Sequence, residues 1–156
     1  MDLLQELEGF GFNYRGNIEL DKDCQYPIFK LVEDANEHIT GNVYLWIVKK
    51  YNANPIVIYI GLTNKTINER YKNGHTPGFR RKPGKRLSDA LLIYLNEDPK
   101  TKILVYAKPS SKITLFGQES ISICDAEETA LIIRFQKHPL LNKSKNKKQI
   151  TLSDLK

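Results

Sequence analysis

The order of elements that the sequence predicts indicates an α+β fold, a small central antiparallel sheet flanked by helices. Residues 43–48 and 56–60 are rich in β-branched and aromatic side chains, which is typical of strands. A short polar segment with Asn52, Asn54 and Pro55 separates them and has the composition of a turn. Strands joined so closely pair as an antiparallel hairpin, because parallel pairing needs a crossover of about a dozen residues.

Two helices are predicted before this hairpin. Residues 2–8 place three leucines at helical spacing, and the glycines at 9 and 11 end this short helix. Residues 27–38 carry Ile28, Leu31, Val32 and Ala35 on one helical face, which predicts a second helix.

After the hairpin the sequence alternates helix and strand. Asn64 or Thr66 is expected to cap a helix that carries Arg70, and residues 75–85 form a basic loop. A helix at 87–95 and a strand at 102–107 follow, and then a hairpin or edge strand from 113–116 and 120–123. The last predicted helix covers 126–137, with Asp125 as its N-cap and Glu128 three residues on in a capping box.

Length and composition favour a one-domain, water-soluble protein. The chain has 156 residues, and its hydrophobic content of 40% and charged content of 27% are ordinary for a globular protein. No apolar run reaches the roughly 18 residues of a membrane helix, and the N-terminus does not resemble a signal peptide. We therefore expect a cytoplasmic protein in which Cys24 and Cys124 are reduced and buried.

Charge divides the chain into an acidic N-terminal extension of the same domain (1–40), a core (41–142) and a basic C-terminal tail (143–156). The first 40 residues hold nine acidic and three basic residues, whereas 70–88 and 129–153 hold seven and six basic residues and no acid. The rest of the chain therefore has 11 basic residues against all 18 acidic ones. Basic runs can be merely solvated loops, but two such segments on one face would follow the phosphates of double-stranded DNA. The residues expected to bind DNA are Lys72, Arg80, Arg81, Lys82, Lys85, Arg86, Lys143 and Lys145.

Two short motifs carry a family resemblance. Val43-Tyr44-Leu45 and Tyr59-Ile60-Gly61, followed by Arg70, Glu127 on the last helix and Asn142, resemble the GIY-YIG nucleases. The likeness covers about residues 41–142 and is greatest to the compact type II restriction endonuclease branch. The first motif keeps only its tyrosine, and Gly74 stands where a family histidine is frequent, with His75 one place later.

The resemblance implies a role for each of these residues. Tyr44 would be the general base or a water-orienting phenol, and Tyr59 would hold the attacking water or a metal-bound water. Arg70 would contact the scissile phosphate, and Asn142 would brace the site by hydrogen bonds. His75 and Lys72 would approach the leaving group or a phosphate.

One carboxylate is expected to bind the metal ion. Mg²⁺, or Mn²⁺ in its place, binds through one or two carboxylates together with water and phosphate oxygens, so a single glutamate suffices. Glu127 and Glu128 are both candidates. We favour Glu127, because the capping box would occupy Glu128 and because Glu127 has the family's position relative to Asn142.

The sequence thus predicts a divalent-metal-dependent endonuclease on double-stranded DNA, expected to be sequence-specific like the restriction branch. Many such enzymes cut as dimers, so a homodimer is a further expectation. A homing or repair-type structure-specific nuclease is an alternative within the same class. A non-catalytic DNA-binding module on a degenerate nuclease fold and a basic protein-interaction domain are alternatives from other classes.

Overall fold

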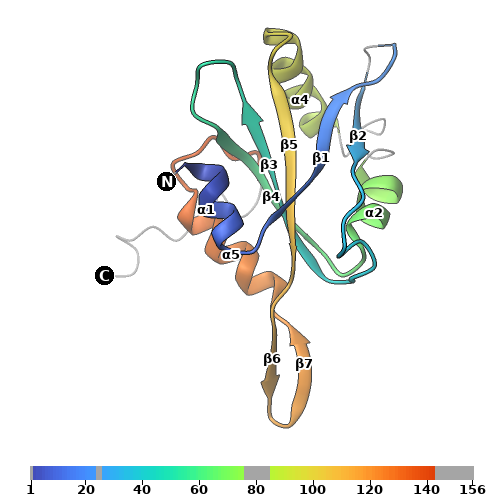
Figure 1. Cartoon of the computed structure of the whole chain (residues 1–156), viewed down its shortest axis with the longest axis vertical. Helices are drawn as coiled ribbons and strands as arrows, with labels where there is room; N and C mark the ends of the chain where they lie inside the picture. Colours follow the sequence, from blue (N-terminus) through green and yellow to red (C-terminus); the bar gives the residue numbers. More distant parts are fainter. Residues whose placement is uncertain (1, 24–25, 76–84, 143–156) are drawn as a thin grey trace.

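A five-stranded antiparallel sheet organises the computed structural model, which describes residues 2–23, 26–75 and 85–142 (Figure 1). The strand order is β2-β1-β5-β3-β4, and each neighbouring pair is antiparallel. The strands are β1 (Asn13–Leu20), β2 (Pro27–Leu31), β3 (Asn42–Lys49), β4 (Ile56–Thr63) and β5 (Lys102–Pro109). The α+β class with a central antiparallel sheet and flanking helices is confirmed.

Helices cover both faces of this sheet. The helices are α1 (Leu3–Gly9), α2 (Ile67–Glu69), which continues into the π-helical segment η1 (Arg70–His75), α4 (Lys85–Glu97) and α5 (Cys124–Arg134). Alternate residues of β3 face opposite layers, as the period of two in a strand requires. Leu45 and Ile47 pack with residues of α1 and α5, whereas Trp46 and Val48 pack with residues of η1 and α4.

The N-terminal 40 residues differ from the prediction for 27–38. The helix expected there is wrong, because residues 27–31 form strand β2. The side chains that pack on the core are Phe29 and Leu31, two residues apart, whereas Val32 is 43% exposed. β1 was not anticipated either, and it pairs with both β2 and β5, so the acidic segment supplies two strands of the main sheet.

A second, two-stranded sheet projects from the end of the main one (Figure 1). It consists of β6 (Lys112–Leu115) and β7 (Gln118–Ser122), which confirms the predicted hairpin. The hairpin lies between β5 and α5 in the chain.

The start of α5 corrects another expectation. The helix begins at Cys124, its N-cap is Ile123, and no side chain caps it, so the capping box of Asp125 and Glu128 is wrong. A capping box forms instead at α1, between Asp2 and Gln5.

Cys124 is buried and a free thiol, whereas Cys24 lies outside the described residues. In the part of the chain that the structure describes, no helix has the length and apolar character needed to cross a bilayer.

Candidate active site

Tyr44 lies near the beginning of β3, at the end of the sheet where β4 and β5 finish. It is opposite Gly61 of β4 and Ala107 of β5 in the sheet register. Its side chain is fully buried, and Arg70 Nε donates a hydrogen bond of 3.3 Å to its phenolic oxygen. The sheet end and the helical segment after β4 therefore bring the first motif and the predicted arginine into direct contact.

Thr66 explains why Arg70 is held at this position. Its hydroxyl accepts a hydrogen bond of 3.1 Å from the Glu69 amide and so caps α2, as predicted. Ile67 is buried beneath the helix and fixes it on the sheet. Arg70 follows directly after α2 and is partly buried, so its charge is close to the protein surface.

Gly61 is needed because the Tyr44 ring lies against its backbone. A Cβ at Gly61 would be 2.4 Å from Tyr44 Cζ and 2.5 Å from its phenolic oxygen. Real Cβ contacts are not this short, so any side chain here requires the Tyr44 ring to move. The glycine at the end of the second motif is therefore required by the position of Tyr44, the tyrosine of the first motif.

Aromatic rings surround the Tyr44 phenol. The ring centroids of Tyr44 and Tyr59 are 6.2 Å apart, and those of Tyr44 and Tyr71 are 5.3 Å apart. Trp46 stacks on Tyr59 at 4.3 Å and donates a hydrogen bond of 3.0 Å to the Tyr71 hydroxyl. These contacts hold the two motif tyrosines in fixed orientations.

Burial raises the pKa of both motif tyrosines. For Tyr44 burial is the main cause and the neighbouring Tyr59 adds to it, while the Arg70 guanidinium opposes the rise without cancelling it. For Tyr59 burial again raises the pKa most, with Arg70 opposing. Both phenols are therefore neutral near pH 7 in this environment.

Glu128 belongs to this cluster. It lies on the buried face of α5 with Cys124, Leu131 and Ile132 and is only 8% exposed. Its negative charge is close enough to contribute to the raised pKa values of Tyr44 and Tyr59, after the larger effect of burial. The carboxylate of Glu128 and the two phenols thus interact electrostatically across the sheet end.

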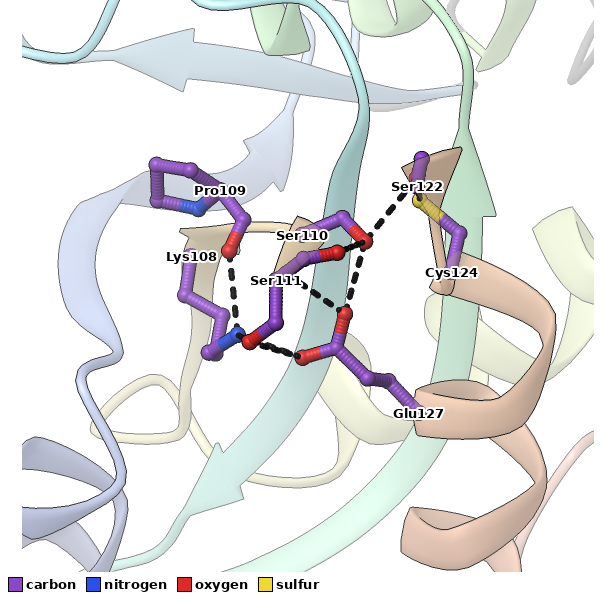
Figure 2. A network of polar contacts seen from close by, with 7 residues as sticks. All are labelled: Lys108, Pro109, Ser110, Ser111, Ser122, Cys124 and Glu127. Atoms are coloured by element: carbon purple, nitrogen blue, oxygen red, sulfur yellow. Dashed lines mark hydrogen bonds and ion pairs between the residues drawn. The ribbon is translucent and has the colours of Figure 1, made fainter. Parts of the chain in front are cut away.

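Glu127 points to a different set of partners, at the base of the hairpin (Figure 2). Its Oε2 lies 2.5 Å from Lys108 Nζ, and its Oε1 accepts hydrogen bonds from Ser110 Oγ at 2.7 Å and the Ser111 amide at 2.9 Å. Burial by itself raises the pKa of Glu127, but these donors together outweigh it and hold the pKa below its usual value. Glu127 thus joins α5 to the segment between β5 and β6.

Asn142 braces the outer edge of β4. Its side-chain oxygen accepts a hydrogen bond of 3.0 Å from the Ile60 amide, and its side-chain nitrogen donates one of 2.6 Å to the Ile60 carbonyl. Ile60 lies between Tyr59 and Gly61, so the amide group of Asn142 fixes the backbone of the second motif. The family resemblance implies a bracing role for Asn142, and these are hydrogen bonds that would perform it.

The other predicted residues are placed more widely. Lys72 is exposed on η1, and Lys85 pairs with Asp89 one turn along α4 at 3.2 Å. Arg86 donates a hydrogen bond to the Leu141 carbonyl, which connects α4 to the segment carrying Asn142. His75 ends η1 in the backbone. The remaining predicted DNA-binding residues lie outside the described residues: Arg80, Arg81, Lys82, Lys143 and Lys145.

The donor set fits a single hard cation. Among residues 2–23, 26–75 and 85–142 there is no group of three or more His, Cys, Asp and Glu side chains that could form a closed metal cage. The buried Glu128 carboxylate, within electrostatic range of two phenols, is an oxygen donor of the kind that suits Mg²⁺ or Mn²⁺ when water and substrate oxygens complete the ligand set.

Comparisons with known proteins address the fold. No protein-family model and no curated protein matches the chain. Among solved structures, a glutamate-to-alanine mutant of bacteriophage T4 EndoII is similar with a TM-score of 0.63 and 20% identity, over 92% of this chain and 100% of that chain. The restriction endonuclease HPY188I, solved in complex with product DNA, is similar with a TM-score of 0.47 and 18% identity, over 88% of this chain and 80% of that one. The chain therefore shares the fold of the phage T4 endonuclease EndoII.

Proposed function

We propose that this chain is an endonuclease that hydrolyses phosphodiester bonds of double-stranded DNA with Mg²⁺ or Mn²⁺, and that it is sequence-specific. The observation that carries the proposal is the contact between Arg70 and the buried Tyr44 phenol, beside Tyr59 and Glu128. A phosphate clamp, two orienting hydroxyls and a carboxylate are the groups that phosphodiester hydrolysis requires. The shared fold with EndoII supports the same assignment.

Glu128, not Glu127, is proposed as the metal-binding carboxylate. Three observations support the change from the sequence-based choice. The capping box that would have occupied Glu128 is absent, Glu128 is buried within the electrostatic range of Tyr44 and Tyr59, and the Glu127 carboxylate is bound by Lys108 and Ser110. A carboxylate that already pairs with an ammonium group has to give up that pair before it binds a cation.

The metal ion, when bound, compensates charge on the phosphate and assists ionisation of a water. The chain's own residues do the remaining work. The Tyr44 phenol is neutral and buried, so it acts through hydrogen bonding: its hydroxyl oxygen accepts from Arg70 Nε and holds that guanidinium in place. Arg70 uses Nε on Tyr44, and the other N–H groups of its planar guanidinium suit a scissile phosphate oxygen.

Tyr59 and Asn142 position the reacting groups. Tyr59 lies next to Tyr44 and is partly exposed, which suits its side chain to orient the attacking water. Asn142 fixes the β4 backbone that carries Tyr59 and Gly61. This division between contacting and bracing residues predicts that a change at Asn142 is tolerated better than a change at Arg70.

Nicking of supercoiled plasmid tests the proposal. Wild-type protein is incubated with Mg²⁺, Mn²⁺ or EDTA, and the ends of the products are sequenced to map the sites. We expect cutting with either metal and none with EDTA. Tight, salt-dependent DNA binding without cutting, across many sequences, would instead indicate a non-catalytic binding module. The absence of any DNA affinity would exclude both a nuclease and a DNA-binding module.

A further inference from the structure

The tip of the β6–β7 hairpin has an unusual residue for its position. Leu115 pairs with Gln118, so Phe116 and Gly117 form a two-residue turn, with φ of 50° and 76°. A turn with positive φ at both central residues favours Asn-Gly, because a bulky side chain is strained in this conformation. Phe116 therefore occupies this place at a cost to the turn, and such a cost at a surface position indicates a function.

Phe116 is also fully exposed. Its relative exposure is 101%, the highest among the large apolar side chains of the described residues, and Ile113 and Leu115 below it are 37% and 46% exposed. A two-stranded hairpin without a packing partner is only marginally stable in water. The apolar side chains of this hairpin thus lack the cover that the helices give to the main sheet.

The base of the hairpin is nevertheless firmly held beside the candidate active site. Glu127 binds Ser110 and Ser111 at the start of the hairpin, and Ser122 at its end donates to Ser110 at 3.0 Å (Figure 2). In the sheet register Pro109 is opposite Asn42, two residues from Tyr44, which is roughly 7 Å along a strand. The base of the hairpin is therefore anchored at the edge of the site, and its tip extends away from it.

The reach of the hairpin suits a nucleic-acid groove. Phe116 is seven positions after Pro109, and at roughly 3.3 Å per residue the tip extends up to about 23 Å beyond the main sheet. A two-stranded ribbon fits a major groove about 8.5 Å deep, and apolar tips wedge between base pairs in several DNA-bending proteins. A second copy of the chain fits less well, because one ring buries roughly 200 Å² whereas a stable interface needs about 800 Å² per partner.

We infer that Phe116 stacks on or between base pairs of duplex DNA bound at the Tyr44–Arg70 site, with β6–β7 lying in a groove. The inference rests on the proposed function for its substrate. Residues 110–124 hold one lysine and one glutamate, so the hairpin has no net charge with which to attract phosphates. Its contribution to DNA binding would be base stacking by the Phe116 ring. The basic segments and Phe116 then divide the work, phosphate contacts for the former and base contacts for the latter.

Tryptophan fluorescence tests this contact without requiring cleavage. The chain has one tryptophan, Trp46, which is fully buried, so Phe116→Trp adds a distinct reporter at the tip. The matched control is Tyr51→Trp: Tyr51 is 65% exposed in the β3–β4 turn, at the opposite end of β3 from Tyr44. Both variants are titrated with a mixed-sequence DNA duplex in EDTA, and Phe116→Ala is compared with wild type for affinity.

We expect DNA to quench the fluorescence of Phe116→Trp strongly and to leave that of Tyr51→Trp unchanged. We expect Phe116→Ala to bind DNA roughly 10-fold more weakly than wild type. Quenching with DNA in a protein that never nicks plasmid would keep this inference and overturn the nuclease proposal. Normal nicking with an unquenched tip and unchanged affinity would overturn the inference alone. Emission at the tip that depends on protein concentration without DNA would overturn it in favour of self-association, and absence of DNA binding would overturn both.

Discussion

Gly61 and Tyr44 are mutually constrained across the β3–β4 hairpin, because a Cβ at Gly61 would lie 2.4 Å from the Tyr44 ring. Gly61→Ala should therefore displace the phenol and the Arg70 hydrogen bond with it. A misplacement of about 1 Å can cost on the order of 100-fold in rate, so we expect at least that loss of nicking in a protein that still folds.

Gly9→Ala is the control for this substitution. Nothing lies within 4 Å of a Cβ at Gly9, so its nicking rate and circular dichroism should equal those of wild type. If Gly61→Ala also cuts at the wild-type rate, the position of Tyr44 does not matter for catalysis.

The raised pKa of Tyr44 predicts its behaviour in alkali. A phenol is neutral below its pKa, so Tyr44, Tyr59 and Tyr71, whose pKa values are all raised chiefly by burial, should remain protonated while exposed tyrosines ionise. Tyrosinate absorbance measured up to about pH 11 should be the same for wild type and Tyr44→Phe, as long as both remain folded. A smaller signal in Tyr44→Phe would show that Tyr44 ionises in that range and would restore the general-base role.

Glu127 should matter for stability. Its side chain is 17% exposed and pairs with Lys108, which is 16% exposed, so Glu127→Gln leaves a covered ammonium without its partner. We expect a loss of about 1–3 kcal/mol in the free energy of unfolding at pH 7, measured with urea. The exposed pair of Lys50 and Glu97 provides the control, and Glu97→Gln should cost less than about 1 kcal/mol.

The pH dependence of this loss follows from the lowered pKa of Glu127. A carboxyl with a lower pKa in the folded than in the unfolded state stabilises the fold above its unfolded pKa, about 4.3, and loses that contribution as pH falls through the folded pKa. The difference between wild type and Glu127→Gln should therefore shrink as the pH falls below the unfolded pKa and through the lower folded pKa. A difference that is constant with pH would exclude the ion pair as its cause.

Asn142→Ala should weaken the edge of β4. It removes two hydrogen bonds to Ile60, so we expect the free energy of unfolding to fall by about 1–3 kcal/mol and nicking to decrease with it. Asn96→Ala, at an exposed position of α4, should leave both measurements near wild type. Unchanged stability and cutting in Asn142→Ala would show that Asn142 does not brace β4.

The sequence could predict the hairpin and its tyrosines because their signals are local. Two apolar segments and a polar turn determine an antiparallel pair, and Thr66 marks the helix that carries Arg70. The N-terminal strands could not be predicted in this way. β1 is stabilised mainly by pairing with β5, almost ninety residues away, and β2 by pairing with β1, so their evidence lies in the partner strands.

The choice between Glu127 and Glu128 relied on a capping box that does not form, and the reason differs from that for the strands. It depended on where α5 begins, and helix ends are the least certain part of a sequence-based prediction. A start at Cys124 moves Glu128 from the third helical position to the fifth, away from the cap and onto the buried face with Leu131 and Ile132. The spacing of residues 124, 128, 131 and 132 in the sequence places them on one helix face, and this spacing could have indicated that Glu128 is buried.

Plasmid nicking by Glu128→Gln and Glu127→Gln, side by side in Mg²⁺ and after both are shown to be folded, is the sharpest test of Glu128 as the metal-binding carboxylate. Both substitutions remove one charge and keep the side chain's size, from adjacent positions of the same helix. We expect a loss on the order of 1,000-fold or more for Glu128→Gln, and a rate within a few-fold of wild type for Glu127→Gln. The reverse order, with Glu128→Gln active and Glu127→Gln inactive, would contradict this assignment.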